Sequence, residues 1–432
     1  MPIFKKNKSK KKICVIGLDG VPYSLLVELA KSGLMSTVAR LIDSGHLHQM
    51  KASLPEISAV SWTNFMTGTN PGTHGIFGFL DFKPGSYDLR IPNFLDVKVD
   101  TLWDHLAEEG YKSIVINQPS TYPARRINGV MVSGFVAVDL SRSVYPSSFF
   151  TALEQMGYQI DVDSSKVAEN PALLWPELSK TMASHQKALN YFWEQDWEFF
   201  EFVITGTDRL HHFLWSAYED KSHPGHQAFL DFYQQVDRII AKIIASFKKL
   251  NQSEDSLFIL SDHGFTGIIQ EVYLNAWLEK AGYLSFTTPT PRSLNDISPE
   301  SVAFALDPNR IYLNLENKFP AGHVPRSQKK ELKSEIAQKL LQLEYNGQKV
   351  IRQVFKSEEI YKGKYSSLGP DLIALSEPGF DLKGSIRKKE IFGRSYLQGM
   401  HTWDDAFFWA AEDYGPNLAI QDIASLIMKK VK

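Results

Sequence analysis

Short apolar runs alternate with helical patterns along most of this 432-residue chain, and this alternation restricts the possible folds more than any other feature of the sequence. The runs are apolar almost throughout, as strands buried on both faces of a sheet are. Such alternation favours an α/β fold, with a mostly parallel central sheet flanked by helices on both faces. The predicted strands lie in KICVIGLDG, KSIVINQP, GVMVSGF, EFFEFVITG and SLFILSDHG, and the predicted helices cover residues 23–32, 101–109, 174–193 and 227–250.

The composition changes between residues 295 and 364, where lysine and glutamate become frequent. RIYLNLEN has the pattern of a hairpin strand, and SQKKELKSEIAQKLLQLEY has the pattern of an amphipathic helix. We therefore predict one main domain over residues 12–432, with a small inserted α+β cap over residues 295–364. The main sheet is expected to resume near PDLIALS.

Charge and hydropathy restrict the partners and the location of the chain. A net charge of −2 gives no reason to expect a nucleic-acid polymer as a partner. No apolar run reaches the ~18 residues of a membrane span, and the run after the basic N-terminus is too short for a signal peptide, so we expect a cytoplasmic protein. The single cysteine, Cys14, lies in an apolar run and is predicted to be a buried strand residue. Residues 1–11 are predicted to form a disordered basic tail, with weak contact to an anionic membrane as the alternative.

Two of the predicted strands are followed by residues of types that can bind metals. Asp19 follows the first strand, and Asp262 with His263 follows the last of the five. In open α/β sheets, ligands bind beyond the carboxyl ends of the strands, so these side chains are expected in the same crevice. Carboxylate and imidazole groups are suitable ligands for a divalent cation. The alternative for each aspartate is a structural role as a turn or helix cap.

The segment GTDRLHHFLW adds a third group of possible ligands. If it is helical from Asp208, then Asp208 and His212 lie four residues apart on one face and can bind one ion together. His211 would point away by about 100°, the rotation per helical residue. Alternatively, Asp208 is a helix cap and His212 a packed core residue. Arg209 is expected to be a solvated surface charge, with a contact to the substrate as the alternative.

A serine- and threonine-rich stretch, ISAVSWTNFMTGTNPGTHG, offers a nucleophile. A helix is predicted to begin at Ser58, and a helix N-terminus presents free N–H groups and a positive dipole to a phosphate. A serine oxygen bound to a divalent cation loses its proton more easily and becomes a usable nucleophile. The alternative is that Ser58 only caps the helix. His74 is expected to be structural. The competing hydroxyls are Ser61, Thr63, Thr67 and Thr73.

Together these segments resemble the alkaline phosphatase superfamily, and within it the type I phosphodiesterase/nucleotide pyrophosphatase branch. That branch includes bacterial and archaeal proteins described as phosphohydrolases or phosphomutases. The likeness runs from about residue 12 to the C-terminus with the motifs in the family's order, and the set is specific although no single motif is. The segments that carry it are VIGLDG, SAVSWTNFMTGTNPGTHGIFGF, TLWDHLAEEGYKSIVINQPSTYP, INGVMVSGF, TDRLHHFLW, LSDHGF and GMHTW.

The resemblance implies the superfamily's fold and a site for two divalent metal ions, usually zinc, with manganese also compatible. It implies that Ser58 attacks phosphorus in line, forming a phospho-enzyme intermediate that water then hydrolyses. One ion would be held by Asp208, His212 and His401. The other would be held by Asp19, Asp262, His263 and the oxygen of Ser58.

Three differences from the family's pattern bear on the substrate. Nucleotide-hydrolysing relatives carry threonine as the nucleophile and asparagine three residues later, whereas this chain has Ser58 and Ser61. The last motif has Asp405 where the family has glycine. The arginine that monoesterases place beside the nucleophile has no evident counterpart. These differences put a nucleotide substrate in doubt and favour a diester over a monoester.

The sequence therefore predicts a two-metal phosphohydrolase, and most specifically a phosphodiesterase that acts on a small-molecule phosphate ester through Ser58. Ser61, Thr121 and Tyr122 are the predicted substrate-binding residues. One alternative is a phosphomonoesterase or a phosphomutase, in which a cap excludes water from the same site. A second is a catalytically silent protein that binds a phosphate ester.

Overall fold

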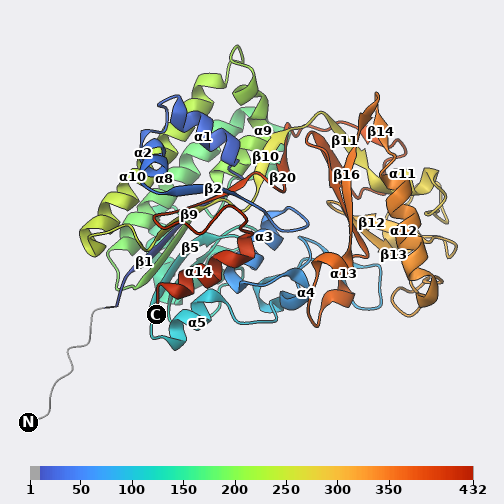
Figure 1. Ribbon diagram of the computed structural model, residues 1–432, viewed down its shortest axis with the longest axis horizontal. Coiled ribbons are helices and arrows are strands. Elements are labelled where there is room, and N and C mark those ends of the chain that lie inside the picture. Colours follow the sequence, from blue (N-terminus) through green and yellow to red (C-terminus); the bar gives the residue numbers. More distant parts are fainter. Residues whose placement is uncertain (1–9, 432) are drawn as a thin grey trace, which may run out of the picture.

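The computed structural model describes residues 10–431, so most of the predicted basic tail lies outside the described residues. An eight-stranded sheet in the order β2-β21-β9-β1-β8-β5-β6-β7 forms the centre of the larger part of the molecule (Figure 1). Its strands are β1 (Ile13–Leu18), β2 (His46–Met50), β5 (Ser113–Gln118), β6 (Gly129–Ser133), β7 (Val144–Tyr145), β8 (Phe199–Ile204), β9 (Leu257–Leu260) and β21 (Ala406–Ala410).

The five predicted apolar runs form the five neighbouring strands β9, β1, β8, β5 and β6, which are parallel to one another. The strands outside them, β2 and β21 on one side and β7 on the other, pair antiparallel. The predicted mostly parallel sheet is therefore confirmed. The structure adds antiparallel strands at both edges, which the sequence pattern did not indicate.

Helices cover both faces of this sheet, as predicted (Figure 1). The side chains of β1 alternate between the two faces: Cys14 and Ile16 pack into one hydrophobic core, and Ile13 and Val15 pack into another. The first core lies under α1 (Tyr23–Lys31), α2 (Ser36–Ser44), α6 (Phe150–Met156), α7 (Ser164–Glu169), α8 (Leu174–Trp193), α9 (Gly206–Glu219) and α10 (His226–Asn251). The second lies under α3 (Ser58–Thr67), α5 (Leu102–Glu108) and α14 (Ile423–Lys429).

A second, smaller unit stands beside the main sheet, at the right of Figure 1. Its four-stranded antiparallel sheet has the order β12-β13-β17-β16, and a three-stranded sheet has the order β18-β11-β19. These strands are β11 (Gln270–Tyr273), β12 (Ala303–Leu306), β13 (Arg310–Leu313), β16 (Ile351–Lys356), β17 (Leu372–Ser376), β18 (Phe380–Lys383) and β19 (Phe392–Gly393). The helices of this unit are α11 (Leu274–Lys280), α12 (Lys329–Leu340) and α13 (Ser357–Ile360).

One expectation about this region is wrong. The segment PDLIALS forms β17, which pairs with β13 and β16 in the smaller sheet and does not resume the main sheet. The core of the smaller unit contains residues from Val272 to Leu382, so the predicted cap at 295–364 lies within a larger folded unit. A short apolar run shows that a strand is buried but does not show which sheet it joins.

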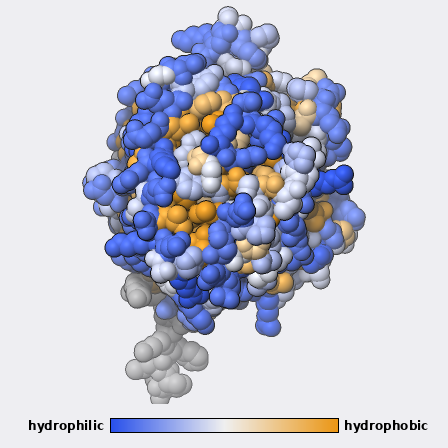
Figure 2. Space-filling view, turned by 90° about the vertical axis from the view of Figure 1, so that its right-hand side faces the viewer, coloured by the Kyte–Doolittle hydropathy of each residue, from blue (hydrophilic) through white to orange (hydrophobic). Residues whose placement is uncertain are grey.

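Short elements connect the two units. The strand β10 (Gly264–Gly267) pairs antiparallel with β20 (Gly399–Thr402) next to the carboxyl end of β9. The end of the molecule that carries the smaller unit is largely hydrophilic, with separate hydrophobic areas near its middle (Figure 2). Between residues 10 and 431, no helix combines the length and the apolar character needed to cross a membrane. The remaining short strands and α-helix are β3 (Asp81–Phe82), β4 (Leu89–Arg90), β14 (Glu344–Tyr345), β15 (Gln348–Lys349) and α4 (Pro71–His74).

Candidate active site

Five of the predicted ligands follow the carboxyl ends of three neighbouring parallel strands, so they lie at one edge of the main sheet. Asp262 and His263 follow β9, and Asp19 follows β1. Asp208 and His212 lie in the first turns of α9, which begins just after β8. Because β9, β1 and β8 are adjacent and parallel, their carboxyl ends meet at this edge.

His401 lies at the same edge of the sheet, although it follows His263 by nearly 140 residues in the sequence. It lies on β20, where Phe265 of β10 is its partner in the antiparallel pair. Since β10 begins directly after His263, this pairing sets the two imidazole rings against each other, with their centroids 3.6 Å apart.

Ser58 is the first residue of α3, as predicted, and is buried. Its Oγ lies 3.1 Å from Nε2 of His263 and 3.3 Å from Oδ1 of Asp19. The competing hydroxyls of Thr63, Thr67 and Thr73 each donate to a backbone carbonyl oxygen. Of the six hydroxyls in this described stretch, Ser58 is the one that contacts the carboxylate and imidazole groups.

The three histidines share one orientation. Nδ1 of His212 contacts the carbonyl oxygen of Gly399 at 3.1 Å, and Nδ1 of His401 contacts that of Glu56 at 2.8 Å. In His263, Nδ1 lies 3.0 Å from the carbonyl oxygen of Gly264. A carbonyl oxygen only accepts, so in each ring Nδ1 carries the proton and Nε2 is left as the lone-pair atom. Histidines that bind metals are typically oriented by such a contact.

The Nε2 atoms and the carboxylates converge into two overlapping groups. Ligand atoms of Asp19, Asp262 and His263 lie within 4.8 Å of one another, and so do those of Asp208, His263 and His401. His212 belongs to the second cluster, because its Nε2 lies 3.0 Å from Nε2 of His401 and 3.5 Å from Oδ1 of Asp208. The structure thus brings all six predicted ligands and Ser58 together.

Two of the aspartates in this cluster have one carboxylate oxygen with a hydrogen-bond partner and one oxygen without a partner in the described part of the chain. Oδ1 of Asp208 and Oδ2 of Asp262 are buried with no hydrogen-bond partner within the described residues. Burial, followed by the charge of Asp208, raises the pKa of Asp262 to about 7. Burial and the charges of the other two carboxylates raise the pKa of Asp19 well above its usual range. A cation bound here would relieve both the desolvation and the repulsion, so the donor set fits divalent metal ions.

Asp208 and His401 lie close together, and each shifts the pKa of the other. Burial alone would raise the pKa of Asp208, but His212, Arg209 and His401 hold it well below its usual range. Burial alone would lower the pKa of His401, but the carboxylate of Asp208, whose Oδ1 is 3.3 Å from its Nε2, raises that pKa. Burial lowers the pKa of His212 to about 3, which keeps that ring neutral and able to bind a metal.

Three residues make contacts with the cluster that sequence reasoning did not predict. Arg209 is buried, not a solvated surface charge: it donates to Asp161 at 2.6 Å and 2.8 Å and to Asp208 at 3.2 Å. Trp62 donates its Nε1–H to Oδ2 of Asp19 at 3.0 Å. Glu56, two residues before Ser58, provides the carbonyl oxygen that orients His401. No local pattern reveals these contacts, because each partner except Asp208 is distant in sequence.

A cavity of about 90 Å³ opens beside His212 and His401, where the smaller unit meets the main one. The carboxylate of Glu56 accepts two hydrogen bonds from Asn309 of the smaller unit, at 3.0 Å and 3.2 Å. The wall contributed by the smaller unit includes the polar residues Asn309, Ser376, Asp381 and Lys383, together with Pro308 and Leu382. Both units therefore shape the space next to the ligand cluster.

The side chains of the predicted substrate-binding residues contact other groups of the chain. The hydroxyl of Ser61 is 2.8 Å from that of Ser53, and the hydroxyl of Thr121 donates to the carbonyl oxygen of Gln118 at 2.7 Å. Both side chains are fully buried. Tyr122 is half-buried, with the guanidinium of Arg142 5.5 Å from its ring centroid. None of the three lines the 90 Å³ cavity.

Three other predicted residues have clear structural roles. His211 points away from the cluster, as predicted, and contacts Gly20 and Tyr233 at 2.9 Å and 2.7 Å. His74 is buried and contacts Asn64 at 2.8 Å, which confirms its structural role. Asp405 accepts hydrogen bonds from the hydroxyl of Ser24 at 2.5 Å and from its backbone N–H at 3.2 Å. The carboxylate that replaces the family's glycine therefore anchors the start of α1.

Comparison with known families agrees with this site. The family model described as type I phosphodiesterase/nucleotide pyrophosphatase matches residues 13–404, and these bounds include all six predicted ligands and Ser58. The chain belongs to that family. It is therefore a phosphoester hydrolase from a family of metal-dependent enzymes. A search of curated protein sequences found no match.

Solved structures of other proteins share the fold of this phosphodiesterase family member, although their sequence identity to it is low. Phosphonoacetate hydrolase from Sinorhizobium meliloti 1021, in complex with phosphonoformate, superposes with a TM-score of 0.63 and 15% identity, covering 98% of this chain and 96% of its own. Murine ectonucleotide pyrophosphatase/phosphodiesterase 5, an inactive variant in complex with AMP, gives 0.58 and 13%, covering 98% and 95%. The human protein of the same name gives 0.56 and 14%, with the same coverage. These likenesses confirm the α/β fold of the alkaline phosphatase type.

Proposed function

We propose that this chain is a two-metal phosphodiesterase whose nucleophile is Ser58. One observation carries the proposal: the Nε2 atoms of three histidines and the carboxylates of three aspartates gather around the start of α3, where Oγ of Ser58 lies 3.1 Å from Nε2 of His263. A buried cluster of this composition without cations would leave carboxylate oxygens unpaired. Nitrogen and oxygen donors without thiolates suit zinc, and they also accept manganese.

We assign the ligands to two ions. The assignment is supported by the two overlapping groups, which share His263. Divalent cations at such a site lower the pKa of a coordinated hydroxyl and stabilise charge on phosphate oxygens. The first ion would be held by Asp208, His212 and His401. The second would be held by Asp19, Asp262, His263 and Ser58.

The reaction would proceed in two displacements at phosphorus. The hydroxyl of Ser58 loses its proton, its oxygen forms a bond to phosphorus, and the bond to the leaving oxygen breaks; one proton is taken up by that oxygen, which leaves as the alcohol. Water then attacks phosphorus, the bond to Ser58 breaks, and a proton released by the water returns to the oxygen of Ser58. The free backbone N–H groups at the start of α3 face the same position and can donate to a phosphate oxygen.

The charges around Ser58 favour a diester. A monoester dianion carries one more negative charge and needs an additional cationic side chain. Arg209, the buried guanidinium that contacts the cluster, is already bonded to Asp161 and Asp208. A cavity of about 90 Å³ suits a small leaving group.

The substrate-binding roles of Ser61, Thr121 and Tyr122 stay predictions. The cytoplasmic location of the chain also stays a prediction.

The test is hydrolysis of bis(p-nitrophenyl) phosphate by metal-free protein to which zinc or manganese is added back. We expect turnover that depends on the metal and falls at least about a thousandfold in Ser58→Ala. Ser425→Ala, which removes an exposed hydroxyl on α14, serves as the matched control and should leave turnover unchanged.

Each other outcome assigns a different function. Full activity in Ser58→Ala would show that another group is the nucleophile. Metal-dependent turnover of p-nitrophenyl phosphate with none of the diester would identify a monoesterase, and an isomerised sugar phosphate without free phosphate would identify a mutase. Binding of phosphate esters without turnover in either metal would identify a silent binding protein.

A further inference from the structure

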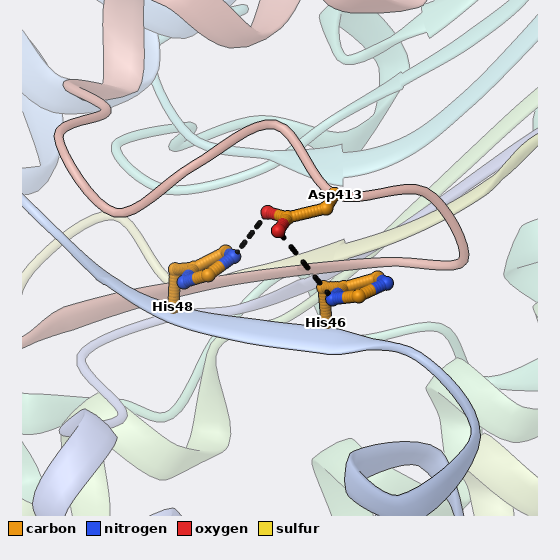
Figure 3. Close-up of side chains that lie close together, drawn as sticks. All are labelled: His46, His48 and Asp413. Carbon is orange, nitrogen blue, oxygen red and sulfur yellow. Dashed lines mark hydrogen bonds and ion pairs between the residues drawn. The ribbon is translucent and has the colours of Figure 1, made fainter.

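Two histidines and one aspartate meet on the surface of the main domain, and they share no residue with the active-site cluster (Figure 3). Nε2 of His48 lies 2.8 Å from Oδ1 of Asp413, and Nδ1 of His46 lies 3.8 Å from Oδ2 of the same carboxylate. One ligand atom from each of the three residues lies within 4.8 Å of the other two. The side chains are accessible to solvent, with exposures of 45% for His46, 21% for His48 and 55% for Asp413.

The backbone holds these three residues in place. His46 and His48 are two residues apart on β2, so both side chains lie on the same face of the sheet. Their rings are nearly parallel, with an angle of 11° between planes. The neighbouring strand β21 pairs antiparallel with β2 and leads into the loop that carries Asp413. The backbone N–H of Gly415 donates to Oδ1 of Asp413 at 2.8 Å, which orients the carboxylate.

We propose that His46, His48 and Asp413 form a second metal site, which binds one Zn²⁺ at the surface. Two imidazoles and a carboxylate are a common donor set for zinc, and solvent would supply the fourth ligand. Ligand atoms about 2.0–2.2 Å from a tetrahedral ion lie roughly 3.3–3.6 Å from one another. The observed separations of 2.8 Å and 3.8 Å lie on either side of this value, so small side-chain rotations would complete the site.

The position of the site gives the ion a structural role. The strand β2 runs into the segment that carries Ser58, and β21 follows directly on the segment that carries His401. An ion bound to His46, His48 and Asp413 would join β2, an edge strand of the main sheet, to the loop after β21. Since the ion would bind the folded chain and not the unfolded one, zinc should raise the thermal unfolding temperature through this site.

The experiment counts zinc ions per chain by equilibrium dialysis of the full-length protein against micromolar free Zn²⁺ near neutral pH. We expect His46→Ala/His48→Ala to bind one ion fewer than the wild type and to keep phosphodiesterase activity. Asp413→Asn tests the same site without removing a ring and should weaken binding of that ion. His105→Ala, which removes an exposed histidine of α5, is the matched control and should bind the wild-type number.

The result does not depend on how many ions the active site holds. A variant with Asp208→Asn and Asp262→Asn should still bind the surface ion, and it should lose that ion when His46 and His48 are also replaced. Equal zinc counts in the wild type and in His46→Ala/His48→Ala would overturn the surface site. If His46→Ala/His48→Ala binds one ion fewer than the wild type, while the variant with Asp208→Asn and Asp262→Asn binds as many as the wild type, the surface site is supported. The same result would contradict the ligands assigned in the active site.

Discussion

The Nε2 atoms of His212 and His401 lie 3.0 Å apart, while Nδ1 of each ring contacts a backbone carbonyl oxygen. With both ring protons on Nδ1, two lone pairs would face each other in a buried site, unless a metal ion or a proton lies on them. The raised pKa of His401, caused mainly by the nearby carboxylate of Asp208 against the effect of burial, indicates that a positive charge is favoured at this position. A divalent cation would satisfy the same requirement.

We therefore expect His401→Gln to weaken zinc binding by more than the roughly 10–100-fold that loss of an outer hydrogen-bonding partner causes. The substitution removes the Nε2 donor and keeps a polar side chain. Zinc titration of the metal-free protein with metal analysis measures the change, and activity should fall in parallel. His105→Gln, at an exposed position of α5, is the control. Wild-type zinc affinity in His401→Gln would rule out His401 as a ligand.

Trp62 orients a proposed ligand from outside the site. It is fully buried and donates its indole N–H to Oδ2 of Asp19. Trp62→Phe should lower zinc affinity about tenfold, because Asp19 loses the donor that fixes its carboxylate. Trp103 offers a matched control, since it is also fully buried in the same core and donates instead to Glu201. Trp103→Phe should lose about as much stability as Trp62→Phe but keep the zinc affinity of the wild type. Equal losses of zinc affinity in both variants would mean that core packing, and not the hydrogen bond to Asp19, is responsible.

Much of the candidate site could be predicted because the proposed ligands follow local rules. Asp19 and Asp262 each come after an apolar run, and parallel strands bring such positions to one edge. The spacing of four residues placed Asp208 and His212 on one face of a helix. Ser58 stands at a helix start in the sequence pattern and in the structure.

The contacts between distant segments could not be predicted in the same way. The burial of Arg209 depends on Asp161, 48 residues away, and the bond between Glu56 and Asn309 spans 253 residues. The strand β2 has the sequence HLHQM, whose polar residues gave no signal of a strand in the main sheet. Its pairing with β21 exists only in the folded chain, and so does the surface group of His46, His48 and Asp413.

Asn309 connects the smaller unit to the active site through Glu56. Asn309→Ala removes the amide Nδ2 that donates to both oxygens of the buried Glu56 carboxylate, and it should cost about 1–3 kcal/mol of stability in denaturant unfolding. Because Asn309 lines the cavity beside His212, the variant should also raise KM more than it lowers kcat. In a Glu56→Gln background, Asn309→Ala should lower the free energy of unfolding by less, because the interaction between residues 56 and 309 is already weakened. Equal costs in both backgrounds would show that the two side chains are not coupled.

Glu201 makes the stability of the chain depend on pH. It lies in the middle of β8, fully buried, with Oε2 accepting from Trp103 at 3.0 Å and Oε1 without a partner in the described structure. Burial raises its pKa from 4.5 to about 8, so the folded state keeps the proton at a pH where the unfolded chain has lost it. The stabilising contribution is therefore complete below pH 4.5 and is lost progressively as the pH rises towards 8.

Glu201→Gln keeps the shape of the side chain and cannot ionise. Its stability relative to the wild type should therefore increase between pH 5 and pH 8 by a few kcal/mol, as roughly 1.4 kcal/mol per pKa unit implies. Urea unfolding at several pH values measures this difference. Glu154→Gln, at an exposed position of α6, is the control and should follow the wild type across the same range. A constant difference between Glu201→Gln and the wild type would mean that Glu201 ionises as readily in the folded chain as in the unfolded one.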